Sequence, residues 1–267
     1  MTTTTADLEY DGRIPFGAIR DTFAVTQRNL IHFFRIPQLL VFSTIQPVIF
    51  VLLWRFVFGG AVRGTGGVPY VDFLMPGIFV QTVVFGAMAT AIGLAADLKT
   101  GMLERFLSLP MSRSAVLTGR TLADLVRNIF VVILMVIVGF LVGFRIHTNV
   151  GSFLVGLLLV LLFGYALSWI FATVGLLVKD PETAQAAAFP VLAPLVFASS
   201  AFIPILTMPG WLQAFARNQP VSVTVEAVRA LSIGGPTTRP VLQALIWCGA
   251  LVAVFAPTAV RLYRRAL

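Results

Sequence analysis

Charged side chains are scarce in this 267-residue sequence, and their scarcity excludes a soluble fold. Asp, Glu, Lys and Arg together make up 11% of the residues, whereas hydrophobic types make up 58%. A soluble domain carries about 25% charged residues, so this chain cannot cover itself with a solvated surface. Several apolar runs reach the roughly 18 residues that are needed to span a bilayer. We therefore expect an all-α polytopic membrane protein.

Cysteine and histidine are also nearly absent, which removes most catalytic and metal-binding chemistry. The one cysteine, Cys248, lies inside an apolar run and has no partner for an internal disulfide. The two histidines, His32 and His147, lie at the edges of apolar runs and show no metal-ligand spacing. The sequence contains no G-x-x-x-x-G-K-[ST] motif, so it cannot bind ATP through a P-loop. We expect neither an enzyme nor a cofactor bound by this chain.

Acidic residues are few and are scattered near the ends of the apolar runs, at Asp72, Asp97, Asp124, Asp180 and Glu226. A membrane enzyme would need such groups gathered at one cavity, and a proton-coupled carrier would need them near mid-membrane. Their scatter is an argument against both classes.

Six apolar runs are expected to cross the membrane, at residues 38–58, 73–96, 117–144, 153–178, 184–205 and 241–260. The fifth run contains Pro190, Pro194 and Pro204, which predict a kinked or broken helix. An even number of spans places both termini on the same side of the membrane.

The arginines and lysines predict which side that is. With the N-terminus in the cytoplasm, thirteen cations fall in cytoplasmic segments and five in outer segments, with Arg55 left inside the first span. Cytoplasmic loops carry the excess of Lys and Arg, so both termini are expected in the cytoplasm. The net charge of +8 is thereby explained by membrane topology, and no nucleic-acid partner is expected. Arginine outnumbers lysine by seventeen to two, as in GC-rich bacteria, so we expect a bacterial cytoplasmic membrane.

The segment that precedes the first span, residues 1–37, contains an amphipathic pattern. At 100° per residue one narrow arc of residues 16–34 holds Phe16, Ile19, Phe23, Leu30 and Phe34. This pattern favours a helix lying along the inner membrane surface, with its cations near anionic lipid. The alternative is an amphipathic helix packed on a partner. Residues 38–267 would form the six-helix membrane domain.

The outer segment 206–235 is too apolar for a free loop. Trp211, Leu212 and Phe215 share one helical face, and residues 221–231 predict a second helix that Gly234 and Gly235 stop. Neither helix is long enough to span, so we expect short re-entrant helices in the outer leaflet.

A charged stretch, "GMLERFLSLPMSR", separates the second and third runs. On a helix over residues 100–110, one half holds Met102, Leu103, Phe106, Leu107 and Leu109. The other half holds Glu104, Arg105 and Ser108, and Pro110 ends the helix before Arg113. The pattern alone fits either a helix that transmits force from a soluble partner or a loop resting on lipid headgroups.

Two motifs resemble those of type-2 ABC exporter permeases. "ERFLSLPMSR" is similar to that family's cytoplasmic signature, E-R-[LF]-x-x-x-P-[LIM]-S-R, and "NQPVSVTVEAVRAL" is similar to its late outer signature, an Asn-x-Pro followed by a V-E-x-x-R helix. The resemblance covers nearly the whole chain and is strongest to the daunorubicin-resistance type.

The resemblance implies a transmembrane exporter subunit that is powered by two copies of a separate ATPase, which uses ATP and Mg, and paired with a second permease half. It implies that the helix at 100–110 is a coupling helix, with the ATPase contacted by Met102, Leu103, Glu104, Arg105, Phe106, Leu107, Leu109, Pro110 and Arg113. The outer-helix motif would consist of Asn218, Pro220, Glu226 and Arg229. The cargo would be an amphipathic drug, lipid or glycolipid.

Polar residues inside the apolar runs are candidates for a substrate path, namely Gln46, Gln81, Thr82, Ser199 and Ser200. Each can equally serve in a helix–helix hydrogen bond. An ion-coupled carrier or a membrane-embedded enzyme acting without an ATPase is the alternative function.

Overall fold

The computed structural model describes residues 15–35, 37–60, 62, 67–102 and 113–265, and the regular structure of these residues is helical throughout. In chain order the elements are α1 (Pro15–Arg35), α2 (Pro37–Leu52), the π-helix η1 (Leu53–Phe58), α3 (Tyr70–Lys99), α5 (Arg113–Val142), α6 (Val150–Val178), α7 (Pro181–Phe197), the 3-10 helix η2 (Ile205–Thr207), α8 (Gly210–Asn218), α9 (Pro220–Ile233) and α10 (Thr238–Arg265).

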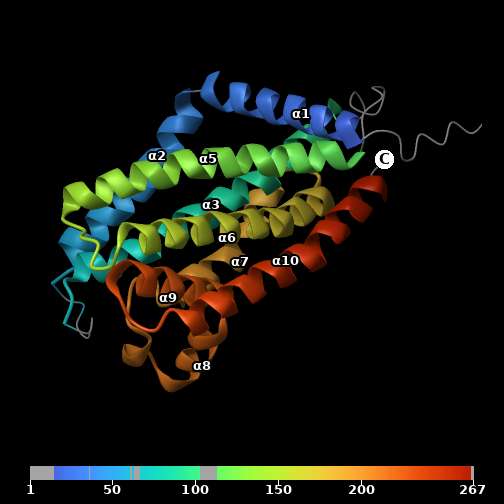
Figure 1. The fold of residues 1–267 in the computed structure, drawn as a ribbon. Coiled ribbons are helices and arrows are strands. Elements are labelled where there is room, and N and C mark those ends of the chain that lie inside the picture. Colours follow the sequence, from blue (N-terminus) through green and yellow to red (C-terminus); the bar gives the residue numbers. More distant parts are fainter. Residues whose placement is uncertain (1–14, 36, 61, 63–66, 103–112, 266–267) are drawn as a thin grey trace, which may run out of the picture.

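Four of these helices, α3, α5, α6 and α10, are long and apolar enough to cross a membrane. Their axes lie roughly along the length of the bundle (Figure 1). The expectation of an all-α polytopic membrane protein is thereby confirmed. The predicted first span corresponds to two consecutive elements, since α2 passes directly into η1. The predicted fifth span corresponds to α7, which has 17 residues.

The fifth predicted span differs from the structure. α7 continues through Pro190 and Pro194 without a break and ends at Phe197, not at residue 205. Backbone groups of Ala198 and Ala201, directly after the helix, are hydrogen-bonded to side chains and do not continue it. Gln219 donates from Nε2 to the carbonyl of Ala198 over 2.9 Å, and Ser199 Oγ accepts from the amide of Ala201 over 3.1 Å.

α3 is the central helix and packs against α5, α6, α7 and α9. Of its most apolar 18-residue stretch 67% is buried, against 11% for α10. Close approach depends on small residues: a Cβ added at Gly77 would lie 2.1 Å from the carbonyl oxygen of Ala201. The segment after α7 is therefore seated directly on the α3 backbone.

The start of α1 and the end of α10 lie at one end of the bundle, and the α5–α6 connection lies at the other (Figure 1). This placement is what an even number of crossings requires. The assignment of the first end to the cytoplasm remains a prediction from the arginines.

The predicted surface helix is present as α1, and it packs against α5 of the same chain. Val25 is buried, and Thr26 donates from Oγ1 to the carbonyl of Gly119 over 3.0 Å. Phe23 is 67% exposed, so its side of α1 does not pack against the rest of the described chain. The face of α1 that contacts α5, which includes Val25 and Thr26, thus differs from the predicted apolar arc. The helices approach closely there because α5 has a glycine, Gly119, opposite Val25.

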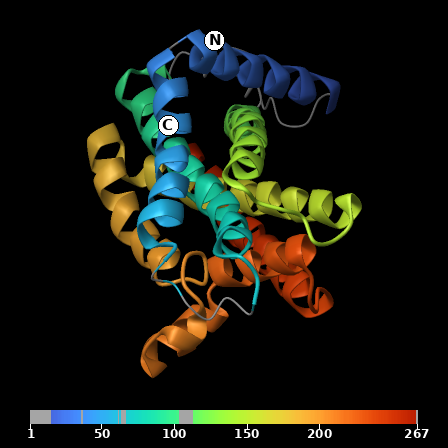
Figure 2. The same ribbon diagram turned by 90° about the vertical axis from the view of Figure 1, so that its left-hand side faces the viewer.

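The two short outer helices are α8 and α9, and they differ in their surroundings. α8 projects from the bundle in both views (Figures 1 and 2) and exposes 76% of Trp211 and 44% of Phe215. α9 is enclosed by α3, α6 and α10 and buries most of its residues. Only α8 therefore presents the apolar face expected of a helix in the outer leaflet.

Candidate functional site

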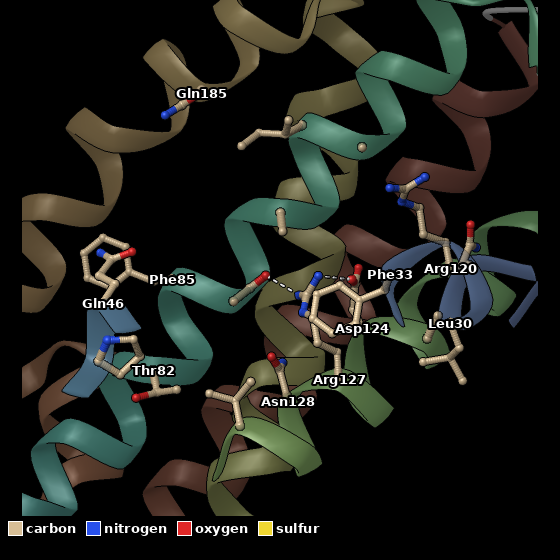
Figure 3. Close-up of a pocket in the computed structure, with 18 of the residues that line it drawn as sticks. Leu30, Phe33, Gln46, Thr82, Phe85, Arg120, Asp124, Arg127, Asn128 and Gln185 are labelled. Atoms are coloured by element: carbon tan, nitrogen blue, oxygen red, sulfur yellow. Dashed lines mark hydrogen bonds and ion pairs between the residues drawn. The ribbon is translucent and has the colours of Figure 1, made fainter. Parts of the chain in front are cut away.

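A cavity of about 750 Å³ lies between α1, α2, α3 and α5, and Gln185 reaches its edge from α7 (Figure 3). Ligand cavities of drug-sized molecules fall in the range of about 300–1,000 Å³. Much of the wall is apolar or aromatic, including Leu30, Phe33, Phe50 and Phe85. The predicted surface helix α1 therefore forms part of the cavity wall in addition to its contact with α5.

Buried charges occupy the α5 side of this cavity. Arg127 Nη1 lies 2.8 Å from Asp124 Oδ1, three residues earlier on the same helix face. Arg127 also donates from Nη2 to the carbonyl of Gly86 over 2.6 Å (Figure 3). Thr90 of α3 donates from Oγ1 to Asp124 Oδ2. Both members of the ion pair are thus hydrogen-bonded to α3.

A second ion pair joins the same two helices, between Arg120 of α5 and Asp97 of α3. Of the acids that the sequence analysis names, Asp124 lines the cavity, and Asp97 is joined to it only through its pair with the lining residue Arg120. A signal was present in the sequence: Arg120, Asp124 and Arg127 follow at intervals of four and three, which places them on one face of a helix.

Three of the five predicted path residues, Gln46, Gln81 and Thr82, line this cavity. The other two lie elsewhere, near α9. Ser199 donates from Oγ to the carbonyl of Val196, and the amide of Ser200 donates to Ser222 Oγ over 3.1 Å. The hydrogen bond of the Ser199 side chain is thus local to its own segment, and within the described residues Ser200 Oγ has no partner, so neither side chain makes the helix–helix bond that was the alternative.

Sequence reasoning missed Asn128, which also lines the cavity. It is 2% exposed and lies between two helices at positions where they have glycine. A Cβ at Gly86 would lie 2.4 Å from Asn128 Oδ1, and one at Gly164 would lie 3.3 Å from Nδ2. No local pattern marks Asn128, because its surroundings come from α3 and α6.

The predicted coupling helix lies mostly outside the described residues, which exclude Leu103, Glu104, Arg105, Phe106, Leu107, Leu109 and Pro110. Its start is described. Gly101 has a φ of 66°, the left-handed conformation that commonly follows a helix C-terminus, and it ends α3 directly before Met102. Arg113 is the first residue of α5. The role of these nine residues stays a prediction.

Two residues of the outer-helix motif, Glu226 and Arg229, form an ion pair at the centre of a set of contacts. The guanidinium of Arg229 donates to Glu226 Oε1 over 2.8 Å, to the carbonyl of Ser200 over 2.8 Å and to that of Phe73 over 3.1 Å. It also stacks on the Phe73 ring, 3.7 Å from the centroid. Pro220 begins α9, and Asn218 donates to the carbonyl of Ala214. Arg229 thus joins α9 to α3 and to the segment after α7.

A third acidic site lies on the α5–α6 connection. The buried Asp72 accepts from the amide of Arg145 over 2.8 Å, and its Oδ2 lies 2.8 Å from His147 Nε2. Among the residues that the structure describes, no three His, Cys, Asp or Glu side chains gather as metal ligands would. The Asp72 site therefore fastens a loop to α3.

The fold and the cavity define a polytopic helical membrane protein with a ligand-sized space between its helices. Residues 20–232 match the model of the ABC-2 type transporter family, so the chain belongs to this family.

Its similarity to curated proteins covers between 73% and 93% of each chain compared. It is 37% identical over 250 residues to the daunorubicin resistance ABC transporter permease protein DrrB1 of Streptomyces coeruleorubidus, covering 92% of this chain and 87% of that one. It is 26% identical to the probable doxorubicin resistance ABC transporter permease protein DrrC of Mycobacterium tuberculosis, covering 93% and 90%. It is 30% identical to the putative transport permease ycf38 of Porphyra purpurea, covering 79% and 73%. The resemblance that the two motifs carry is thereby confirmed.

Proposed function

We propose that the chain is the transmembrane subunit of an ATP-driven exporter, which moves an amphipathic drug, lipid or glycolipid outward across the cytoplasmic membrane. The observation that carries the proposal is the cavity between α1, α2, α3 and α5, whose wall combines aromatic side chains with buried polar groups. An amphipathic molecule needs both kinds of surface. The names of two relatives, which refer to daunorubicin and doxorubicin resistance, support a drug as the cargo.

Energy would come from two copies of a separate ABC ATPase, which bind the ATP and Mg. The sequence of this chain has no P-loop of its own. The coupling helix at residues 100–110 would sit in a groove of the ATPase, and α3, which ends just before it, would transmit the movement.

The complex would contain a second permease half, either a copy of this chain or a homologous one. Closure of the ATPase pair would rock the two halves against each other, which is an alternating-access change of the domain-motion type. The cavity lies between helices that connect directly to both ends of the coupling segment, α3 and α5. Movement of that segment would therefore change the shape of the cavity.

The proposal is tested by export. The chain is expressed in a drug-sensitive bacterium with and without a candidate ABC ATPase partner, and efflux of daunorubicin is measured. Efflux should require both proteins and should be lost with an ATPase that binds but cannot hydrolyse ATP. Efflux by the chain alone, driven by a proton gradient, would instead establish the ion-coupled carrier.

The coupling helix is tested separately, with Glu104→Ala and Phe106→Ala. Anchor residues of an interface often cost 2 kcal/mol or more when truncated, which is roughly a thirtyfold loss of affinity. Both variants should insert normally but lose co-purification with the ATPase or substrate-stimulated ATP turnover. If both retain the partner and normal stimulation, residues 100–110 form a loop on lipid headgroups.

A further inference from the structure

The π-helix η1 places an arginine, Arg55, within an exposed apolar surface. η1 follows α2 at the end of the bundle that carries the α5–α6 connection (Figure 1). The next two residues, Phe56 and Val57, are 70% and 69% exposed. An exposed apolar surface of a membrane protein contacts acyl chains or another protein. An ionised group inside such a surface needs a partner, and its partner indicates what the surface contacts.

The guanidinium of Arg55 lies beside the exposed part of η1. Its Cζ is 5.8 Å from the centroid of the Phe56 ring, the most exposed side chain of this helix. The preceding residue, Trp54, packs into the protein instead and stacks on Phe202, with ring centroids 4.5 Å apart. This contact holds η1 against the segment after α7, so it also fixes the place of Arg55. π-helical turns are rare and frequently occur at functional sites.

Arg55 has no acceptor within the part of the chain that the structure describes. Its Nε is buried there without a hydrogen bond, whereas the terminal nitrogens Nη1 and Nη2 are not enclosed. A ligand therefore meets the terminal nitrogens. A guanidinium has five N–H donors, a permanent positive charge and no acceptor. The group that completes this site is accordingly an anion with acceptor oxygens.

The acids of the protein are already occupied at this end of the bundle. Its sequence includes six arginines but two acids, Asp72 and Glu226, in the segments 55–72, 143–150 and 198–240. Asp72 is buried with each carboxylate oxygen 2.8 Å from a nitrogen partner, and Glu226 pairs with Arg229. A second copy of this chain would bring the same two occupied acids. The anion that Arg55 requires therefore comes from another molecule.

We propose that Arg55 binds the phosphate group of a membrane phospholipid, whose acyl chains lie along Leu52, Phe56 and Val57. A guanidinium and a phosphate form two parallel charge-assisted hydrogen bonds. An arginine near the end of a span reaches the headgroups while its aliphatic stem stays among the acyl chains. A phospholipid supplies both the anion and the apolar chains, whereas free phosphate supplies only the anion. The site lies outside the cavity and does not depend on the proposed function.

Lipid titration of the full-length chain tests the proposal. Phosphatidylglycerol is added to the detergent-solubilised protein, and native mass spectrometry measures the dissociation constant of the first bound lipid. Arg55→Met removes the charge and keeps an unbranched stem, so it should weaken binding about tenfold, equivalent to 1.4 kcal/mol. Arg55→Lys keeps a point charge and should lose about threefold or less. Binding by Arg55→Met as tight as that of the native chain would disprove the proposal. Arg55→Gln replaces Arg55→Met if the latter does not fold.

The matched control is Arg217→Met, which removes an arginine from the same end of the molecule. Arg217 is exposed on α8 and already donates to Gln213 Oε1 over 3.1 Å. Its substitution should leave the dissociation constant within about twofold of the native value. An equal loss in the Arg55 and Arg217 variants would show that the lipid follows overall positive charge, and the assignment to Arg55 would be wrong.

Two further probes distinguish a phospholipid from its parts. Dioleoylglycerol has the acyl chains without the phosphate, so native chain and Arg55→Met should bind it equally. Inorganic phosphate at millimolar concentration should not displace phosphatidylglycerol. Displacement by phosphate, or dioleoylglycerol binding that depends on Arg55, would overturn the proposal. A native dimer that Arg55→Met converts to monomers with unchanged lipid binding would instead show that the η1 surface is an interface between copies.

Discussion

At the scale of single residues, Arg229 shows how an ionised side chain is made acceptable in an apolar protein. It is 6% exposed, yet it has a carboxylate, two carbonyls and an aromatic face around it. Three of these partners belong to the protein core, whereas the Glu226 side chain is 44% exposed. The carbonyls of Phe73 and Ser200 therefore matter more to the placement of Arg229 than its ion pair does.

We expect Arg229→Ala to be severe and Glu226→Gln to be mild. Loss of Arg229 leaves buried carbonyls without a donor, which costs about 3 kcal/mol and about 6–12 °C in apparent melting temperature. Loss of the Glu226 charge removes about 0.2–0.5 kcal/mol. Thermal unfolding in detergent measures both. Equal effects of the two substitutions would show that the ion pair, and not the carbonyl contacts, holds α9.

The cavity pair Asp124–Arg127 leads to a second prediction, because both members are nearly buried. Removing one partner of a buried pair costs about 3–5 kcal/mol, since the other charge stays behind without compensation. Asp124→Leu should therefore destabilise the protein strongly. The double variant Asp124→Leu/Arg127→Leu should recover most of that loss, as measured by the yield of monodisperse protein and by melting temperature. Additive losses would show that the two residues act independently.

At the scale of elements, the side chain of Asp180 stabilises the junction between α6 and α7. Its carboxylate accepts from the amide of Thr183 over 3.0 Å at the start of α7 and from Lys99 Nζ over 2.7 Å at the end of α3. These bonds, Lys99 first and then Thr183, lower the pKa of Asp180 to about 2. One side chain thus caps α7 and ties it to α3.

A lowered pKa means that Asp180 contributes stability only while it is ionised in the folded state. The contribution is complete above the unfolded pKa of 3.8 and is lost as the pH falls towards about 2. The melting-temperature difference between the native chain and Asp180→Asn should therefore be constant from about pH 5 to 8 and shrink below about pH 4. A difference that grows on acidification would contradict the assignment.

The helices were largely predictable from the sequence, whereas their contacts were not. Long apolar runs and Pro or Gly signals located α3, α6 and α9 to within a few residues. The end of α7 was misplaced because Gln219, a residue 21 positions further along the chain, binds the carbonyl of Ala198 directly after the helix. The cavity was predictable only in part: Gln46, Gln81 and Thr82 stood out as polar residues in apolar runs. Asn128 required knowledge of which helices meet.

At the scale of the whole molecule, the orientation in the membrane is a prediction from the cations in the segments that join the apolar runs. Cys248 is 2% exposed, so Cys248→Ala provides a background without native thiols. Single cysteines at Thr65 and Pro236 should then react with an impermeant thiol reagent applied to intact cells, and one at Ser112 should not. Labelling of a cysteine at Ser112 from outside would show that the topology is the reverse of the predicted one.

α10 stands apart from the rest of the molecule in the small share of its surface that the protein covers. It contributes few buried side chains, mainly Ala244, Cys248, Ala259 and Tyr263. Within the described residues, the hydrogen-bond partners of Arg229 lie in α3, α9 and the segment after α7, and none of them belongs to α10. The centre of the protein can therefore pack without α10. Protease resistance of α9 in a chain truncated after residue 237 would show that this centre assembles by itself, whereas rapid cleavage of α9 would show that it depends on α10.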